Sequence, residues 1–276
     1  MGNGSVKVVT VIDGENALLP AEVRQERIAK VVTEFGFVRV RELSDRFGVS
    51  EVTLRSDLDT LERRGVLRRV HGGAMAGGET RVERSFEEAA NALSTEKASI
   101  GRAAVSLLSS GESVIIDVGT TTTAMARALV AEVALVDITV ITNSLTIALE
   151  VERGSPRLNV IVTGGTLRPK QHSLVNPLGS AFFEQLRVGT LFLGCNGIDP
   201  AHGVTNINLP EAEMKRAMVA SAQRIVVLAD SSKIGASALA NVCPIDLVDV
   251  LVTDSAASVE LCNELQARGV QVVIAE

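Results

Sequence analysis

The chain has 276 residues, of which 46% are hydrophobic and 22% charged, and its formal net charge is -6. This length allows about two domains, and this composition excludes disorder over most of the chain. The chain has no Trp and no Tyr, so it lacks the aromatic platforms that bind single-stranded nucleic acid, and no apolar run reaches the roughly 20 residues that a membrane helix needs.

Cysteine content bears on the compartment. The three cysteines, Cys195, Cys243 and Cys262, are widely spaced and predict neither a disulfide framework nor a zinc site. The first residues lack the continuous apolar run of a signal peptide. We therefore expect a cytoplasmic protein with no metal ion, no cofactor and no membrane partner.

Charge is distributed unevenly. Residues 20–74 carry eleven basic and nine acidic side chains, whereas the remainder has a net charge of -8. Residues 63–78 contain four arginines and one histidine but no acid. A basic patch on an acidic protein is typical of a small anion-binding module attached to a larger domain. A solvated helix end followed by a loop is the alternative.

Short helices are predicted near the start of the chain. Residues 1–19 have no clear period, and we treat them as an extension without an assigned role. Helical spacing of apolar residues predicts helices over 21–34 and 40–47, and Ser50 is a natural N-cap for a third helix that reaches Arg64. A small hairpin follows over residues 66–75. Three helices with a tight turn and a hairpin predict a winged helix-turn-helix over residues 20–75.

The third helix is amphipathic. Leu54, Leu58 and Leu61 fall on one face and should pack inward. The opposite face and the wing would contact double-stranded DNA, with arginine able to pair with guanine and the other side chains able to reach bases or phosphates. The candidate DNA-binding residues are Ser50, Val52, Thr53, Arg55, Ser56, Arg68, Arg69 and His71. A trihelical unit that binds protein is the alternative.

The pattern changes after a Gly-, Glu- and Asn-rich stretch at residues 76–95, which we interpret as a linker. Apolar runs then alternate with helical stretches, as in a mostly parallel sheet covered on both faces. The predicted strands are 113–117, 138–142, 158–162, 190–194, 224–230, 246–254 and 270–275, and the clearest helices are 97–108, 123–130, 211–222 and 258–268. Residues 96–276 are therefore expected to form a Rossmann-like α/β domain.

Ligands of open parallel sheets bind beyond the carboxyl ends of the strands. After the predicted strand 113–117, Gly119 and the threonines that follow it begin a helix whose free amides could bind a phosphate. An ordinary turn with threonine caps is the alternative. Arg168, Lys170 and Lys215 add charge near other strand ends. Cys195 is expected to be a packing residue. The candidate effector-binding residues are Asp117, Gly119, Thr120, Thr121, Thr122, Asn143, Gly165, Asn196, Asp199, Glu211 and Lys233.

Specific motifs carry a family resemblance. Residues 22–75, with VSEVTLRSDLDTLERRG followed by the Arg-Arg-x-His-Gly-Gly wing, resemble the DNA-binding domain of the DeoR family of bacterial transcriptional regulators. The family usually has two adjacent arginines where this chain has Arg55 and Ser56. The motifs IIDVGTTT, VITNSL, VTGGTLR, FLGCNGID, EAEMKRAM and VLADSSKIG, over roughly residues 96–254, are similar to the family's effector-binding domain.

The resemblance implies a fold related to ribose-5-phosphate isomerase and coenzyme A transferases, and an effector that is a phosphorylated sugar or a related metabolite. It implies phosphate contacts from Thr120–Thr122 and Lys233, with Asn196, Asp199 and Glu211 nearer the sugar. The expected protein is a homodimeric or homotetrameric repressor of a carbohydrate operon, without enzymatic activity. The alternative is an isomerase-like enzyme with a DNA-binding appendage, which is disfavoured because the Asn196 amide cannot act as a general base.

Overall fold

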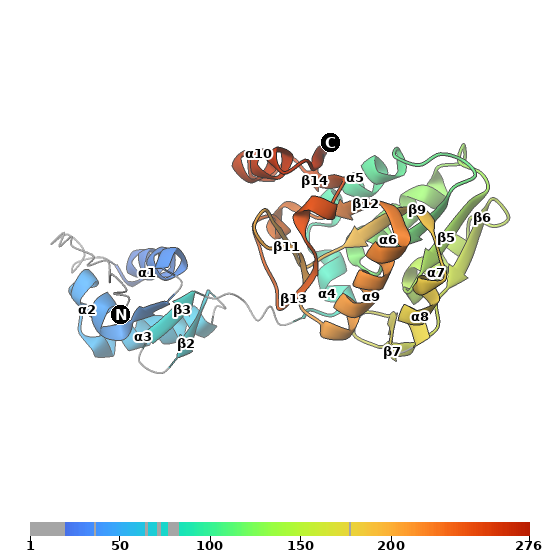
Figure 1. Cartoon of the computed structure of the whole chain (residues 1–276). Helices are drawn as coiled ribbons and strands as arrows, with labels where there is room; N and C mark the ends of the chain where they lie inside the picture. Colours follow the sequence, from blue (N-terminus) through green and yellow to red (C-terminus); the bar gives the residue numbers. More distant parts are fainter. Residues whose placement is uncertain (1–19, 36, 64–65, 71–72, 77–82, 177) are drawn as a thin grey trace, which may run out of the picture. The chain divides into compact units, whose positions relative to one another are not determined.

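The computed structural model describes residues 20–35, 37–63, 66–70, 73–76, 83–176 and 178–276. The chain divides between residues 80 and 81 into two compact units, which are described separately (Figure 1). The extension 1–19 lies outside the described residues. Within the described ranges, no helix is long and apolar enough to cross a membrane.

The first unit has the three helices and the hairpin that the sequence predicts. The second helix has the predicted bounds, and the first extends one residue beyond its predicted end. Arg64, the predicted end of the third helix, lies outside the described residues. The elements are α1 (Ala21–Phe35), β1 (Phe37–Arg39), α2 (Val40–Phe47), α3 (Glu51–Arg63), β2 (Leu67–Val70) and β3 (Gly73–Ala76). The winged helix-turn-helix is therefore confirmed for the residues that the structure describes.

The turn between α2 and α3 follows from two residues. Gly48 ends α2 in the left-handed conformation, with φ of 64°, which costs glycine little. Two residues later, the Ser50 hydroxyl accepts a hydrogen bond from the Thr53 amide at 3.1 Å and so caps the start of α3. These local signals set the turn of the motif.

The core of the first unit is formed by the apolar faces of its helices. Leu54, Leu58 and Leu61 of α3 are buried, as predicted, and they belong to one cluster with Leu43 and Phe47 of α2. Strand β1 was not predicted, because three residues are too few to show a period. It pairs antiparallel with β3, so the wing sheet has the order β1-β3-β2.

The second unit is built on seven parallel strands, one for each predicted apolar run. The last-but-one run differs at its start, where a 3-10 turn, η2 (Ile245–Leu247), precedes the strand. The sheet order is β15-β14-β12-β9-β4-β5-β6. The strands are β4 (Ser113–Ile116), β5 (Ile138–Thr142), β6 (Leu158–Val162), β9 (Val188–Gly194), β12 (Ala222–Leu228), β14 (Val250–Asp254) and β15 (Gln271–Ala275).

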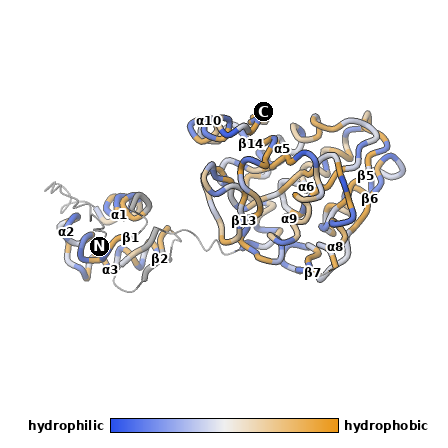
Figure 2. Tube along the Cα trace, in the orientation of Figure 1, coloured by the Kyte–Doolittle hydropathy of each residue, from blue (hydrophilic) through white to orange (hydrophobic). Residues whose placement is uncertain are grey.

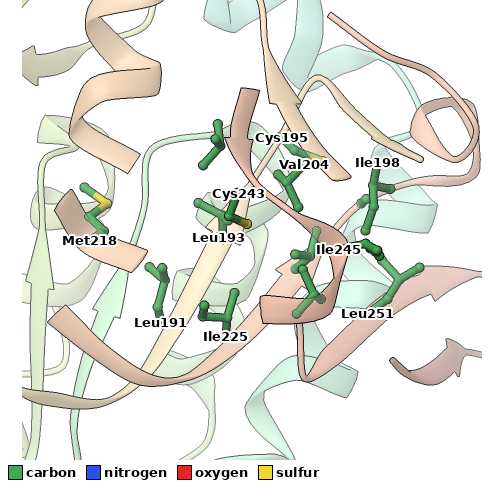
Figure 3. Packing of buried hydrophobic residues seen from close by; sticks show 14 of the residues in the cluster. Leu191, Leu193, Cys195, Ile198, Val204, Met218, Ile225, Cys243, Ile245 and Leu251 are labelled. Carbon is green, nitrogen blue, oxygen red and sulfur yellow. The ribbon is translucent and has the colours of Figure 1, made fainter. Parts of the chain in front are cut away.

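Successive strand residues point to opposite sides of the sheet. Both faces are buried along the inner strands, whereas the edge strands β6 and β15 are partly exposed. Val114 and Ile116 pack with α5 (Ser94–Val105), α6 (Thr120–Ala131) and α7 (Leu145–Glu152). Ile115 belongs to the other cluster, with α8 (Leu178–Glu184), α9 (Leu209–Ser221) and α10 (Val259–Ala267). In that cluster Leu191, Leu193 and Ile225 lie among the labelled side chains of Figure 3. The α/β fold class is confirmed, and hydrophobic stretches alternate with hydrophilic ones along both units (Figure 2).

The expected linker over residues 76–95 needs a correction. Helix α4 (Phe86–Asn91) forms inside it, with a capping box between Ser85 and Glu88. Phe86 is buried, and the division between the units falls before it, at residue 80. The Glu-rich composition that indicated a linker is the amphipathic first turn of a helix that packs on the second unit.

Two small sheets, which were not predicted, are formed by segments that lie between the main strands in the sequence. One is the antiparallel pair β7 (Thr166–Arg168) and β8 (Ser173–Val175). The other has the order β10-β11-β13, with β10 (Gly197–Asp199), β11 (Gly203–Asn206) and β13 (Ala240–Cys243). A 3-10 turn, η1 (Ser231–Lys233), follows β12.

Candidate functional site

Helix α3 presents a polar face that is free to contact DNA. Val52 is 77% exposed, Arg55 and Ser56 are exposed, and Thr53 is half-buried. The inward leucines fix the rotation of the helix, so these side chains point away from the core together. The residues predicted to contact DNA on this helix are therefore exposed to solvent within this unit, and their contact with DNA stays a prediction.

Arg55 has a partner on its own helix. Its Nη2 lies 3.0 Å from Oε2 of Glu51, one turn earlier, and both side chains are about half exposed. An exposed pair of this spacing contributes only about 0.3–0.5 kcal/mol. A guanine or a phosphate can therefore take Arg55 from Glu51 at little cost.

An internal ion pair that the sequence analysis missed fixes α3. Asp57 is 4% exposed on the inner side of the helix. Its Oδ2 lies 2.6 Å from Nε of Arg24, and its Oδ1 accepts from Nε2 of Gln25 at 2.9 Å. Both partners are on α1, so the two helices are held in register by a buried, fully hydrogen-bonded carboxylate.

The wing is only partly described. Arg68 and Arg69 lie on β2, and the backbone of Arg69 is opposite Ala74 of β3. Their place on the hairpin is as predicted. His71 lies outside the described residues.

In the second unit, a crevice is expected between β4 and β9. From β4 the chain proceeds to β5 and β6 on one side, and from β9 it proceeds to β12, β14 and β15 on the other. Open sheets bind ligands at such a reversal of strand order, beyond the carboxyl ends. A ligand is therefore expected near the residues that follow β4, β9 and β12.

Asp117, directly after β4, is the centre of a buried cluster. Its carboxylate is fully buried and forms an ion pair with Lys215 of α9, whose side chain is 3% exposed. Oδ2 also accepts from the Gly194 amide at 3.0 Å, and Lys215 donates to the Gly194 carbonyl at 3.1 Å. Burial raises the pKa of Asp117, and the charge of Lys215 offsets only part of this rise. Oδ1 of Asp117 is buried without a hydrogen-bond partner.

The start of α6 has no side-chain cap. Gly119 is the N-cap residue, with φ of 155°, and it has no side chain to accept from the first-turn amides. The hydroxyls of Thr122 and Thr123 donate to the Gly119 carbonyl at 3.0 and 2.7 Å instead. Thr121 is buried with an unpartnered hydroxyl, and Thr120 is half-buried. Uncapped amides at a helix start favour an anion.

Glu211 lies at the start of α9. Asn208 is the N-cap residue of this helix, and its Oδ1 accepts from the Glu211 amide at 3.1 Å. The residue as a whole is 5% exposed, and its carboxylate accepts from the Ser173 hydroxyl at 2.8 Å. It also forms an ion pair with Arg168 of β7. Glu211 and Lys215 are one helical turn apart, so a single helix supplies both charges to the cluster.

Lysines lie near the end of β12. Lys233 is 3.8 Å from Oδ2 of the buried Asp230. Lys97 of α5, which the sequence analysis did not select, is 5% exposed and donates to the carbonyls of Ala89 and Ala92. Burial lowers the pKa of Lys97, and the charge of Lys233 lowers it further. A pocket of about 530 Å³ between α4, α5 and α6 is lined in part by Lys97 and Thr120.

Four predicted effector residues have structural partners. Asn143 is buried, accepts from the Val118 amide at 3.1 Å and donates to the Leu174 carbonyl at 3.2 Å. A Cβ on Gly165 would lie 2.3 Å from the Val175 carbonyl oxygen, so glycine is needed for strand packing.

The other two residues bind nearby loops. Asn196 accepts from the Ile207 amide at 2.9 Å, and Asp199 accepts from the amides of Ala201 and His202 at 2.8 and 2.9 Å. These bonds fix the backbone around β10 and β11.

Cys195 packs in the apolar cluster shown in Figure 3, as expected. Burial raises its pKa to about 11. A thiol with so high a pKa is protonated at neutral pH and is a poor nucleophile.

A DNA-reading unit joined to a ligand-binding α/β unit defines a transcriptional regulator of the sensor class. Known proteins support this. Residues 24–79 match the model of the DeoR-like helix-turn-helix domain, and residues 93–255 match the model of the DeoR C terminal sensor domain. The chain belongs to the DeoR family.

Individual relatives agree along nearly the full length. The chain is 34% identical to the HTH-type transcriptional regulator GlpR of Haloferax volcanii, over 93% of this chain and 98% of that protein. It is 29% identical to the glycerol-3-phosphate regulon repressor of Escherichia coli K12, over 90% of this chain and 96% of that protein.

Among solved structures, the chain is similar to ribose 5-phosphate isomerase A from Neisseria gonorrhoeae. The TM-score is 0.37 and the identity is 14%, over 52% of this chain and 53% of that one.

Proposed function

We propose that this regulator is a repressor of a carbohydrate operon and that a phosphorylated sugar, or a related phosphorylated metabolite, controls its affinity for operator DNA. The name of the Escherichia coli relative, a glycerol-3-phosphate regulon repressor, supports this class of effector. A regulator of bacterial-type operons works where the DNA lies, which places it in the cytoplasm.

One observation carries the effector site. The Oδ1 atom of Asp117 is buried without a partner, beside a cluster that is otherwise hydrogen-bonded. A buried carboxylate oxygen without a partner is costly, and a sugar hydroxyl that donates to it would remove that cost. The uncapped start of α6 at Gly119 follows the same strand and offers its amides to the phosphate.

The roles of the charged groups follow from this placement. Lys233 supplies positive charge near the phosphate, and Glu211 accepts from the polyhydroxyl part of the effector. Lys215 favours the ionised form of Asp117, because an ammonium group beside a buried carboxylate stabilises its charge. Around these charged groups, the crevice would be shaped by four further residues, Asn143, Gly165, Asn196 and Asp199.

The same side chains favour binding over catalysis. Isomerisation of a sugar phosphate needs a base that removes a proton. The Asn196 amide cannot do so, and Oδ1 of Asp199 accepts from the amides of its own loop. We therefore propose that the chain has no isomerase activity.

A dimer or tetramer is part of the proposal, because paired recognition helices match repeated half-sites on DNA. The first test is the binding of the full-length protein to the DNA upstream of its own gene, measured by fluorescence anisotropy at several salt concentrations. Affinity should fall steeply with salt, because each neutralised phosphate contributes a slope of about -0.9. A flat salt response would contradict the proposal.

The second test is a thermal-shift panel. Glycerol 3-phosphate, ribose 5-phosphate, fructose 6-phosphate and related compounds are compared with the same molecules without phosphate. A ligand that binds only the folded state raises the melting temperature. We expect a shift with at least one phosphorylated compound and none with its unphosphorylated form. Equal shifts for the two forms would refute the phosphate contact.

A further inference from the structure

Arg168, at the end of β7, holds two carboxylates from distant parts of the second unit. Its Nη1 donates to Oε1 of Glu211, at the start of α9. Its Nη2 donates to Oε2 of Glu83 at 2.6 Å. Glu83 precedes α4 in the segment through which the chain continues back to the DNA-binding unit. One guanidinium therefore joins the effector cluster to the start of this segment.

All three side chains are largely removed from water. The exposed fractions are 15% for Arg168, 18% for Glu83 and 7% for Glu211. Burial opposes the charge of Arg168, but the hydrogen bond that Arg168 donates to Glu83 and the charge of Glu211 outweigh it and raise the pKa of Arg168. The contact differs from an ordinary surface pair, because screening by water and salt is reduced.

The turn that follows Arg168 holds the same segment. Nε2 of Gln171 donates to the Arg84 carbonyl at 2.7 Å, and the Phe86 amide donates to the Lys170 carbonyl at 2.9 Å. The Phe86 ring lies 5.4 Å from the ring of His172. Residues 83–86 are thus attached to the β7–β8 hairpin, and their position depends on where the hairpin lies.

The hairpin in turn is fixed by Glu211. Oε1 of Glu211 accepts from Arg168 on β7 and from Ser173 on β8. The charge of Glu211 also acts on Asp117, so the two carboxylates are close. A ligand hydroxyl that donates to Glu211 would compete with Arg168 for the same oxygen atom.

We propose that Arg168 is the positioning residue that couples the effector crevice to residues 83–91, so that a ligand at Glu211 loosens the attachment of Glu83. This inference rests on the proposed effector site. The coupling would connect that site to the DNA-binding unit. A ligand bound at Glu211 would weaken the attachment of the β7–β8 hairpin to residues 83–91, which lead back to the DNA-binding unit. Coupling of this kind requires that the ligand favour one of two arrangements.

Glu83→Gln in the full-length protein tests the contact without any ligand. The variant keeps the size of the side chain and removes its charge. Glu87→Gln is the matched control, because Glu87 is on the same segment, is 64% exposed and lies 3.4 Å from Nε2 of the partly exposed His172. Hydrogen–deuterium exchange should be about threefold to tenfold faster at residues 83–92 in Glu83→Gln and unchanged in Glu87→Gln. Equal exchange in both variants and the wild type would overturn the proposal.

The ligand arm uses the phosphorylated compound that gives the largest thermal shift in the panel, taken from glycerol 3-phosphate, ribose 5-phosphate and fructose 6-phosphate. In the wild type it should speed exchange at residues 83–92, and in Glu83→Gln it should cause no further change. By linkage, Glu83→Gln should bind this compound several-fold more tightly, because binding no longer has to weaken the attachment. A merely structural Glu83 would lower the melting temperature and leave the ligand affinity unchanged.

The two proposals can fail separately. If a compound binds and exchange at residues 83–92 in the wild type does not change, the coupling through Arg168 is refuted while the effector site stands. If no compound in the panel binds, the proposed effector class is refuted, and the comparison of Glu83→Gln with Glu87→Gln still decides whether the ion pair holds the segment.

Discussion

Replacement of Lys215 by Met tests the cluster around Asp117 most severely. The Asp117 carboxylate is fully buried, and the Lys215 side chain is 3% exposed. Methionine has nearly the volume of lysine, so the change removes the ammonium group and leaves a buried carboxylate whose best partner is lost. Breaking a buried pair in this way costs about 3–5 kcal/mol of unfolding free energy.

The assay is urea unfolding followed by far-UV circular dichroism, because the chain has no Trp or Tyr for intrinsic fluorescence. The transition of the larger unit should move to lower urea. The double variant Asp117→Asn/Lys215→Met carries neither charge of this pair, and most of the loss should be recovered. A loss below about 1 kcal/mol in the single variant, or no recovery in the double variant, would refute the reasoning.

The pH dependence of this variant has a defined sign. Burial already raises the pKa of Asp117 in the wild type, and removal of Lys215 raises it further. A carboxyl group whose pKa is raised in the folded state destabilises the fold most when it is ionised. The unfolding free energy therefore falls as the pH rises from the pKa of the unfolded state through that of the folded state. The loss caused by Lys215→Met should therefore be smaller at about pH 5 than at about pH 8. The opposite trend would contradict the assignment.

Three further predictions concern Arg55, Gly165 and Cys195. Arg55→Ala should weaken binding to the upstream DNA by about 1–3 kcal/mol without loss of helical signal, as measured by anisotropy and circular dichroism; unchanged binding would remove Arg55 from the interface. Gly165→Ala should lower stability by about 2 kcal/mol or more, since its Cβ would meet the Val175 carbonyl at 2.3 Å, and an unchanged melting temperature would contradict this. Cys195, with a pKa of about 11, should react with a thiol reagent far more slowly in native protein than in urea; equal rates would show that it is accessible.

Much of the fold follows from local sequence signals. Gly48 and Ser50 set the turn before α3, and the seven apolar runs each became a strand of one parallel sheet. Continuous apolar runs are informative here because the inner strands of the sheet are buried on both faces and need apolar residues on both sides.

The parts that were missed depend on tertiary contacts. Strand β1 is too short to show a period, and it exists because β3 pairs with it. Helix α4 was hidden by its acidic first turn, which is typical both of linkers and of helix starts. Composition within a short window does not separate these two cases.

The candidate site was predicted as a set of strand ends, and the structure places Asp117, Gly194 and Lys215 in one cluster. The pairings themselves were beyond sequence reasoning. Asp57 pairs with Arg24 across 33 residues, and Arg168 pairs with Glu83 across 85. A charged residue in a helix or a loop is usually solvated, so only the folded chain shows which charges are buried against each other.

Reciprocal linkage between the two units tests the central claim most directly. Operator affinity is measured by anisotropy with and without the phosphorylated compound that binds, and the affinity for that compound is measured with and without operator DNA. The proposed repressor predicts weaker DNA binding in its presence, and an equal factor in the two directions. A compound that binds the second unit and leaves operator affinity unchanged would contradict the account.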